Sequence, residues 1–341
     1  MRGARFVLLG LVVVLALALA LLFAWMDWAR TPRGHRGDPP VIVRVEPGSS
    51  AREVARLLEE KGLVRPAWVL TWWLRLGGVA GRIQAGEYRF EPPLTPVEVV
   101  RRLVEGRTRL VRVTIPEGLT LWETADVLAG AGIAPRDDLL AAFRDPAPVR
   151  RLDPRATDLE GYLFPETYHF EPGWPAERVA AELVATFRRT FYEPHRQEIE
   201  ASGMSLREIV TVASLVEKET ARDDERPLVA AVYLRRLARG MRLQCDPTIV
   251  YAKKLEGKWD GRIHRRDLRW DHPYNTYVHS GLPPGPIASP GLASLLAVLH
   301  PRDEGYLYFV ARGDGTHVFS RTFREHLAAV RRYQKPRRRR R

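Results

Sequence analysis

The run Ser205-Leu-Arg-Glu-Ile-Val-Thr-Val-Ala-Ser-Leu-Val-Glu-Lys-Glu-Thr220 is the strongest helix signal in the chain. Ser205 and Glu208 form a capping box, in which each side chain satisfies a backbone amide at the helix start. Apolar residues then follow around most of the circumference, which predicts a largely buried helix at the centre of a domain. Two acidic residues, Glu217 and Glu219, lie at the end of this apolar run.

These two glutamates are candidates for acid–base chemistry. Desolvation raises the pKa of a carboxyl group held among apolar side chains, and a protonated carboxyl can donate to a leaving-group oxygen. Glu217 and Glu219 are about 200° apart around a helix, so they do not form the paired-carboxylate site of a glycosidase. Glu217 shares a face with Ala213 and Ala221, where a bulky substrate could approach, whereas Glu219 lies near a candidate ion partner, Arg222. Taken alone, each is most simply a satisfied or solvent-facing carboxylate.

A second pattern occurs twice, at an offset of 70 residues, starting at Val43 and at Val113. Each copy predicts a short strand, a glycine turn, a hydroxyl N-cap with Glu three residues later, and a helix closed by glycine. A weaker recurrence relates 88–92 to 168–172. The chain is therefore expected to be α+β, with small strand–helix modules over 41 to about 180. The first copy resembles a LysM-type module, and a purely structural strand–helix unit is the alternative.

The N-terminal region predicts a single membrane anchor. Residues 6–26 form an uncharged apolar run of 21 residues, which fits a bilayer core of ~30 Å. Trp25 and Trp28 fall where an interfacial aromatic belt would lie. A cleaved signal peptide is the alternative, but its apolar core is only about 7–15 residues long. Arginines on both flanks leave the orientation undecided, and residues 27–40 are expected to be a tether.

Charge and cysteine content exclude several classes of function. The formal net charge of +13 comes from the two ends, because residues 37–330 carry 41 basic and 40 acidic side chains. A near-neutral body argues against nucleic acid as a partner. The single cysteine, Cys245, excludes an internal disulfide and is expected to be a small buried residue. The sequence has no phosphate loop, metal-binding histidine pair or nucleophile elbow, so we expect no cofactor and no metal.

The stretch 241–290 is rich in Pro, Gly, Asp, Tyr and Asn, and is expected to be a functional loop. Gln244, Asp246 and Tyr274-Asn-Thr-Tyr277 offer amide, carboxyl, hydroxyl and aromatic groups, which suit sugar rings. A loop that caps its own backbone is the alternative. A helix is expected at 225–239. Near the end, Gly313-Asp-Gly315 predicts a hairpin, followed by a helix at 322–334.

Six motifs in order resemble the endolytic murein transglycosylases (MltG/YceG-like). They are Leu159-Glu-Gly-Tyr-Leu-Phe-Pro-Glu166-Thr, Ala213-Ser-Leu-Val-Glu217-Lys-Glu-Thr220, Gly240-Met-Arg-Leu-Gln244-Cys-Asp246-Pro-Thr248, Tyr274-Asn-Thr-Tyr277, Gly281-Leu-Pro-Pro-Gly-Pro-Ile287 and Tyr306-Leu-Tyr-Phe-Val-Ala311. The resemblance covers 41–334. It implies an inner-membrane protein with a cytoplasmic N-terminus and a catalytic domain facing the cell wall. The implied parts are a cytoplasmic segment 1–5, an anchor 6–26, a tether 27–40, a LysM-like subdomain 41–110, a catalytic domain 111–334 and a basic tail 335–341.

The resemblance also implies the chemistry. Glu217 would protonate the glycosidic oxygen between N-acetylmuramic acid and N-acetylglucosamine, and would then accept the proton of the muramic acid 6-hydroxyl as it attacks C1. Candidate substrate-binding residues are Gln244, Asp246, Glu166, Asn275 and Tyr277. The implied partners are peptidoglycan glycan strands and the inner membrane, and association with peptidoglycan synthases is compatible with them. A non-catalytic peptidoglycan-binding scaffold and an ordinary hydrolase are the alternatives.

Overall fold

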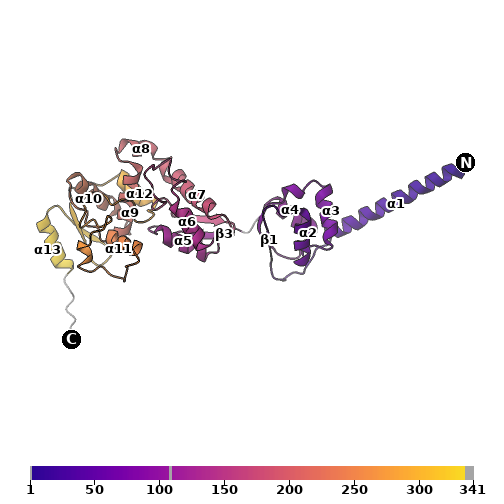
Figure 1. Ribbon diagram of the computed structural model, residues 1–341, viewed down its shortest axis with the longest axis horizontal. Coiled ribbons are helices and arrows are strands. Elements are labelled where there is room, and N and C mark those ends of the chain that lie inside the picture. The colour runs from indigo at the N-terminus through magenta and orange to yellow at the C-terminus, as the bar shows by residue number, and fades with distance from the viewer. Residues whose placement is uncertain (1, 107–109, 335–341) are drawn as a thin grey trace, which may run out of the picture. The chain divides into compact units, whose positions relative to one another are not determined.

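The computed structural model of the protein describes residues 2–106 and 110–334, with the backbone alone for residues 2–9. The expected basic tail, 335–341, lies outside the described residues. Helices and three two-stranded sheets make up the described chain, which confirms the mixed α+β prediction (Figure 1). The chain divides into two compact units, the first holding 1–111 with 170–173 and the second holding 112–169 with 174–341.

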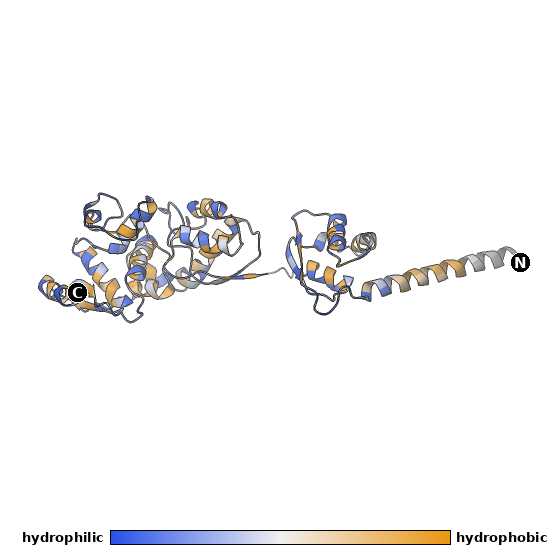
Figure 2. Ribbon diagram, turned by 90° about the horizontal axis from the view of Figure 1, so that it is seen from below, coloured by the Kyte–Doolittle hydropathy of each residue, from blue (hydrophilic) through white to orange (hydrophobic). Residues whose placement is uncertain are grey.

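A long apolar helix, α1 (Arg2–Arg30), begins the first unit. Within it, Gly10–Arg30 has a mean hydropathy of 2.4, long and apolar enough to cross a membrane. Figure 2 shows this helix as an almost continuous apolar rod. The expected anchor, 6–26, lies inside α1, but the helix continues to Arg30. Residues 27–30, which were expected to begin a tether, instead form the last turn of this helix. Trp28 and Ala29 in this turn are buried in the core of the first unit.

The rest of the first unit packs helices on one small sheet. Strand β1 pairs antiparallel with β2, with Val41 opposite Phe90 and Val45 opposite Gly86. Alternate strand residues such as Val43 and Tyr88 point into the core, where they meet the apolar faces of the helices. The elements are β1 (Val41–Val45), α2 (Ala51–Glu60), α3 (Ala67–Leu76), η1 (Ala80–Arg82), β2 (Gly86–Phe90) and α4 (Pro96–Val104).

The repeat predicted from the sequence is confirmed. The order β1-α2-α3-β2-α4 recurs as β3-α5-α6-β4-α7, and β3 pairs with β4. Both predicted capping boxes form, with Ser50 and Glu53 at the start of α2 and Thr120 and Glu123 at the start of α5. The second set is β3 (Val111–Thr114), α5 (Leu121–Gly130), α6 (Arg136–Arg144), β4 (Thr167–Phe170) and α7 (Ala176–Phe187).

The centre of the second unit is the helix predicted from Ser205, α9 (Leu206–Glu219). The capping box of Ser205 and Glu208 forms, and the residues from Ile209 to Val216 are all buried. Helices α10, α11 and α12 pack around α9. The remaining elements are η2 (Arg188–Tyr192), α8 (Arg196–Ala201), α10 (Arg226–Ala238), α11 (Asp246–Leu255), η3 (Asp267–Arg269), α12 (Leu292–Leu299), β5 (Tyr308–Ala311), β6 (His317–Ser320) and α13 (Phe323–Tyr333).

One part of the predicted organisation is wrong. The stretch 241–290 is not a continuous loop, because α11 lies inside it and buries Ile249 and Ala252. Its first turn contains two ordinary helix signals, Asp246 and Pro247. An acidic side chain is favourable beside the exposed amides of a helix start, and proline already has the φ that this position requires. The predicted hairpin is confirmed, since β5 and β6 are antiparallel with Tyr308 opposite Ser320.

Candidate active site

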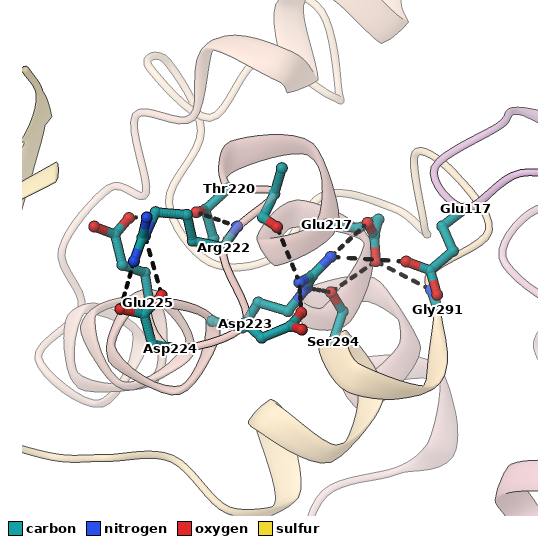
Figure 3. A network of polar contacts seen from close by, with 11 residues as sticks. Glu117, Glu217, Thr220, Arg222, Asp223, Asp224, Glu225, Gly291 and Ser294 are labelled. Carbon is teal, nitrogen blue, oxygen red and sulfur yellow. Dashed lines mark hydrogen bonds and ion pairs between the residues drawn. The ribbon is translucent and has the colours of Figure 1, made fainter. Parts of the chain in front are cut away.

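Glu217 lies at the end of α9, in a closed set of polar contacts (Figure 3). Its Oε2 accepts hydrogen bonds from Ser294 Oγ at 2.7 Å and from the Gly291 amide at 3.1 Å. Its Oε1 lies 3.3 Å from Arg226 Nη2. The Glu217 side chain is only 7% exposed. Of the small residues expected on the face of Glu217, Ala213 is buried and Ala221 is exposed.

Arg226 is the cation at the centre of this set. Its side chain is 6% exposed, and its Nε donates to Ser294 Oγ at 3.0 Å. It also pairs with Asp223 and lies 3.7 Å from Glu117 Oε2. Burial and the neighbouring Glu217 raise the pKa of Glu117. The group therefore brings three acidic side chains, Glu117, Glu217 and Asp223, around one buried guanidinium.

Glu219 has a different environment, two residues further along α9. It accepts a hydrogen bond of 2.7 Å from the Tyr233 hydroxyl, and burial raises its pKa. It lines a cavity of about 420 Å³ together with Gln244, Asp246 and Tyr277. The ion pair expected between Glu219 and Arg222 is absent among the described contacts, since Arg222 binds Asp224 at 3.0 Å instead.

The cavity brings together residues that are far apart in the sequence. Its walls come from α9, from the segment around Gln244, from the β5–β6 hairpin and from α13. Aromatic and apolar side chains alternate there with polar ones, as a sugar-binding surface requires. The other lining residues are Arg236, Leu243, Phe309, Val310, Ala311, His317, His326, Val330 and Gln334.

Three of the predicted substrate-binding residues line this cavity. Gln244 has a left-handed backbone with φ of 53°, which is unusual for a residue with a Cβ atom and is typical of functional loops. Asp246 Oδ1 accepts a hydrogen bond of 2.6 Å from the Tyr277 hydroxyl. Burial, and then this contact with Asp246, raise the pKa of Tyr277. This hydrogen bond holds the Asp246 and Tyr277 side chains against each other at the cavity surface.

The other two predicted binding residues lie elsewhere. Asn275 is buried, and its Nδ2 donates to the carbonyl oxygens of Asp267 at 3.0 Å and Trp270 at 2.7 Å. Its Oδ1 accepts a hydrogen bond from the Tyr277 amide at 3.0 Å. Asn275 therefore caps the backbone of its own loop, which is the alternative to sugar binding stated from the sequence. Glu166 is exposed just before β4, where its Oε1 accepts the Thr167 amide at 2.9 Å, and it does not line the cavity.

The sequence did not indicate Tyr233 and Arg236 as site residues, and both lie on α10. Tyr233 is fully buried against Glu219, and Arg236 Nε donates to the Leu307 carbonyl at 2.7 Å. No local signal marks either residue, because their partners are distant in the chain. Cys245 is buried as expected, and burial raises the pKa of its thiol. Among the described residues, no group of three or more His, Cys, Asp or Glu side chains could hold a metal ion.

Comparisons with known proteins agree with one another. The chain is 31% identical over 309 residues to the endolytic murein transglycosylase of Bacillus subtilis (strain 168), covering 86% of this chain and 84% of that protein. It is 30% identical over 302 residues to the endolytic murein transglycosylase of Streptococcus pneumoniae serotype 2, covering 80% of this chain and 54%, about half, of that protein. A 2.6 Å crystal structure of a yceG-like protein from Listeria monocytogenes matches with a TM-score of 0.58 at 32% identity, covering 85% of this chain and 99% of that one. Residues 43–332 match the YceG-like family, and the chain is therefore a member of that family.

Proposed function

We propose that this protein is an endolytic lytic transglycosylase of peptidoglycan. It cleaves the bond between N-acetylmuramic acid and N-acetylglucosamine inside nascent glycan strands, leaves a 1,6-anhydro-muramic acid end and so limits strand length. The observation that carries the proposal is Glu217, a nearly buried carboxyl held by Ser294, the Gly291 amide and Arg226 at the end of α9. Two residues further along, Glu219 lines a cavity with Gln244, Asp246 and Tyr277. The relatives named endolytic murein transglycosylase support the reaction class.

The reaction needs one carboxyl group that acts twice. In its protonated form it donates to the glycosidic oxygen, which becomes the hydroxyl of the departing sugar. The resulting carboxylate then takes the proton of the muramic acid 6-hydroxyl while that oxygen forms a bond to C1. No water is consumed, and the carboxyl returns to its protonated form. A second catalytic carboxylate is not required.

Two glutamates are candidates for this carboxyl group. The sequence motif predicts Glu217, and membership of the YceG-like family supports this choice. The Glu217 carboxyl is nearly buried and is held in one position by Arg226, Ser294 and the Gly291 amide. Glu219 is the alternative, because burial raises its pKa and it lines the cavity. We assign Glu217 the acid–base role and Glu219 the role of a cavity wall held by Tyr233.

The cavity residues have distinct roles in this proposal. Gln244 and Asp246 hydrogen-bond sugar hydroxyls, and the Tyr277 ring packs on an apolar sugar face. Asn275 positions Tyr277 through the backbone, and Glu166 is expected to contribute little. The second unit faces the cell wall, with α1 in the cytoplasmic membrane and the N-terminus in the cytoplasm. This location gives access to nascent strands, and cross-linking to peptidoglycan synthases would test whether the enzyme works beside them.

The deciding experiment compares E217Q and E219Q in the full-length protein. Each purified variant, in detergent, is incubated with peptidoglycan, and the products are weighed by mass spectrometry. The wild type should release anhydro-muropeptides, which lack one water relative to hydrolysis products. E217Q should lose activity by about 10²–10⁴-fold with an unchanged circular dichroism spectrum, and E219Q should retain more activity than E217Q.

Each other outcome has a definite meaning. Full loss in E219Q with an active E217Q would move the acid role to Glu219. Products carrying an added water would make the protein a hydrolase. Glycan binding without new chain ends, in the wild type itself, would contradict catalysis and support the scaffold alternative.

A further inference from the structure

Helix α3 has two apolar faces, and only one of them is used inside the first unit. Leu70 and Leu74 are fully buried in the core, as expected for an amphipathic helix. On the opposite side, Trp68, Trp72 and Leu76 are 69%, 63% and 76% exposed. Their spacing of four residues places them on one stripe of the helix surface. We call these three residues the α3 stripe.

The α3 stripe belongs to the same rigid part of the molecule as the membrane helix. Trp73, which follows Trp72, contacts the rings of Trp25 and Trp28 of α1 at centroid distances of 6.4 and 6.2 Å. Trp28 Nε1 also donates a hydrogen bond of 2.7 Å to the Arg65 carbonyl, just before α3. Figure 1 shows α3 beside the point where α1 joins the first unit. The end of α1 therefore fixes α3 in place.

These contacts also set the depth of α3. A bilayer core of ~30 Å takes up about 20 helical residues, so the uncharged apolar run 6–26 spans it and leaves Trp25 and Trp28 at its edge, at headgroup level. Since Trp73 contacts both of these tryptophans, α3 lies at the same level. Tryptophan is the residue type that favours this interfacial zone.

The charges around α3 fit the same surface. From Lys61 to Gly86 the chain has four basic residues, Lys61, Arg65, Arg75 and Arg82, and no acidic residue. Basic side chains at the membrane surface are attracted to anionic lipid headgroups. Glu59 is close as well, but its carboxyl accepts the Ala67 amide at the start of α3. An apolar stripe with basic residues on both sides of it in the sequence is typical of helices that lie in a membrane interface.

We infer that the α3 stripe inserts into the interfacial layer of the same bilayer that α1 spans, with the flanking arginines on anionic headgroups. The first unit is then attached to the membrane at two points, α1 and α3, which fixes its orientation on the surface. The inference rests on the anchoring of α1 and not on the proposed reaction, so that either can fail alone.

Site-directed spin labelling tests this in the full-length protein reconstituted in vesicles of phosphatidylglycerol and phosphatidylcholine. A cysteine is introduced as Trp72→Cys or Leu76→Cys in a Cys245→Ala background. The matched control is Ile42→Cys, an exposed apolar residue on β1, which Figure 1 draws at the end of this unit away from α1. Labels at 72 and 76 should be more accessible to oxygen than to a water-soluble nickel complex, and the label at 42 should show the reverse.

Two results would overturn the inference. Labels at 72 and 76 with the same access to the nickel complex as the label at 42 would place the stripe in water. Dipolar broadening between labels at 72 that persists on dilution with lipid would show that a second copy covers the stripe. A label-free measurement uses brominated lipid, which quenches the emission of tryptophans that lie in the membrane. The quenched part of the emission should be smaller in W68F/W72F than in the wild type. In the control, W259F/W270F, the quenched part should be as large as in the wild type.

Discussion

The Tyr233 hydroxyl donates a 2.7 Å hydrogen bond to Oε1 of Glu219, whose side chain lines the cavity of the second unit. Two opposing effects therefore act on this carboxyl group. Burial disfavours its charged form and raises its pKa, whereas the hydrogen bond from Tyr233 stabilises the charged form and lowers it. The balance between them sets the pH range over which Glu219 holds its proton.

Removing the hydroxyl should shift this balance in a known direction. In Tyr233→Phe the charged form of Glu219 loses a donor, so its pKa rises further. A carboxyl whose pKa is raised on folding adds stability below that pKa, and this contribution is lost as the pH rises through it, so Tyr233→Phe should move the loss to higher pH. Urea unfolding across the pH range would measure this, with Tyr192→Phe, outside the cavity lining, as the control. A loss at the same pH in Tyr233→Phe and the wild type would contradict the hydrogen bond between Tyr233 and Glu219.

The buried pair of Arg226 and Glu217 should matter for stability. Arg226→Met leaves Glu217 buried without its cation, which is expected to lower the free energy of unfolding by about 3–5 kcal/mol. Urea denaturation followed by circular dichroism would measure this. Adding Glu217→Gln to Arg226→Met should recover part of the loss, because the uncompensated charge is then gone.

The matched control for this pair is Arg222→Gln. Arg222 is exposed and pairs with exposed Asp224, so its removal should change stability little. Equal losses in Arg226→Met and Arg222→Gln would show that the contacts of Glu217 are not those of a buried ion pair.

Glu160 should make stability depend on pH. It is 2% exposed, accepts the Leu121 amide and the Tyr251 hydroxyl, and burial raises its pKa to about 8. Between pH 4.5 and 8 the folded chain holds a proton that the unfolded chain releases. Its contribution is complete below this window and is lost as the pH rises, by at most about 1.4 kcal/mol per pH unit.

Unfolding curves across this window would reveal the contribution. Glu160→Gln cannot titrate, so the slope of stability against pH should flatten. Glu208→Gln, whose carboxyl has a pKa lowered by its contacts with Ser205, should leave that slope unchanged between pH 4.5 and 8. A wild-type slope retained in Glu160→Gln would disprove the role of Glu160.

Gln244 allows backbone and side-chain effects to be separated. Gln244→Ala and Gln244→Gly both remove the amide, so both should raise KM for glycan strands. Only glycine adopts a φ of 53° without steric cost, so Gln244→Gly should be more stable than Gln244→Ala by about 1 kcal/mol. Thermal unfolding and steady-state kinetics on both variants would check this. Equal stability of the two would show that the backbone at 244 is not strained.

Local signals in the sequence predicted much of the fold. The capping boxes at Ser50, Thr120 and Ser205 all form, because a hydroxyl and a glutamate three residues apart satisfy helix amides without help from the rest of the chain. The hairpin around Asp314 also depends on a short stretch. Helix α11 was missed because proline and aspartate at its start also favour turns, and its buried face depends on distant helices.

The site was predictable only in part, for a similar reason. The sequence motifs predicted Gln244, Asp246 and Tyr277 as substrate-binding candidates, and all three line one cavity. Helical spacing separated Glu217 from Glu219 but could not say which of them meets Arg226 and which meets Tyr233. That choice is made by the packing of α10 and α12 against α9, which helical spacing within α9 does not give.

The last helix, α13, has a consequence for how substrate enters. All of its residues are described and none is buried, yet His326 and Val330 from this helix line the cavity. It packs on the β5–β6 hairpin, where Tyr308 contacts the rings of His326 and Phe323 at centroid distances of 5.2 and 5.8 Å. One wall of the cavity is therefore a helix on the surface of the unit. Under the proposed function, we expect a long glycan strand to enter from this side without being threaded from an end.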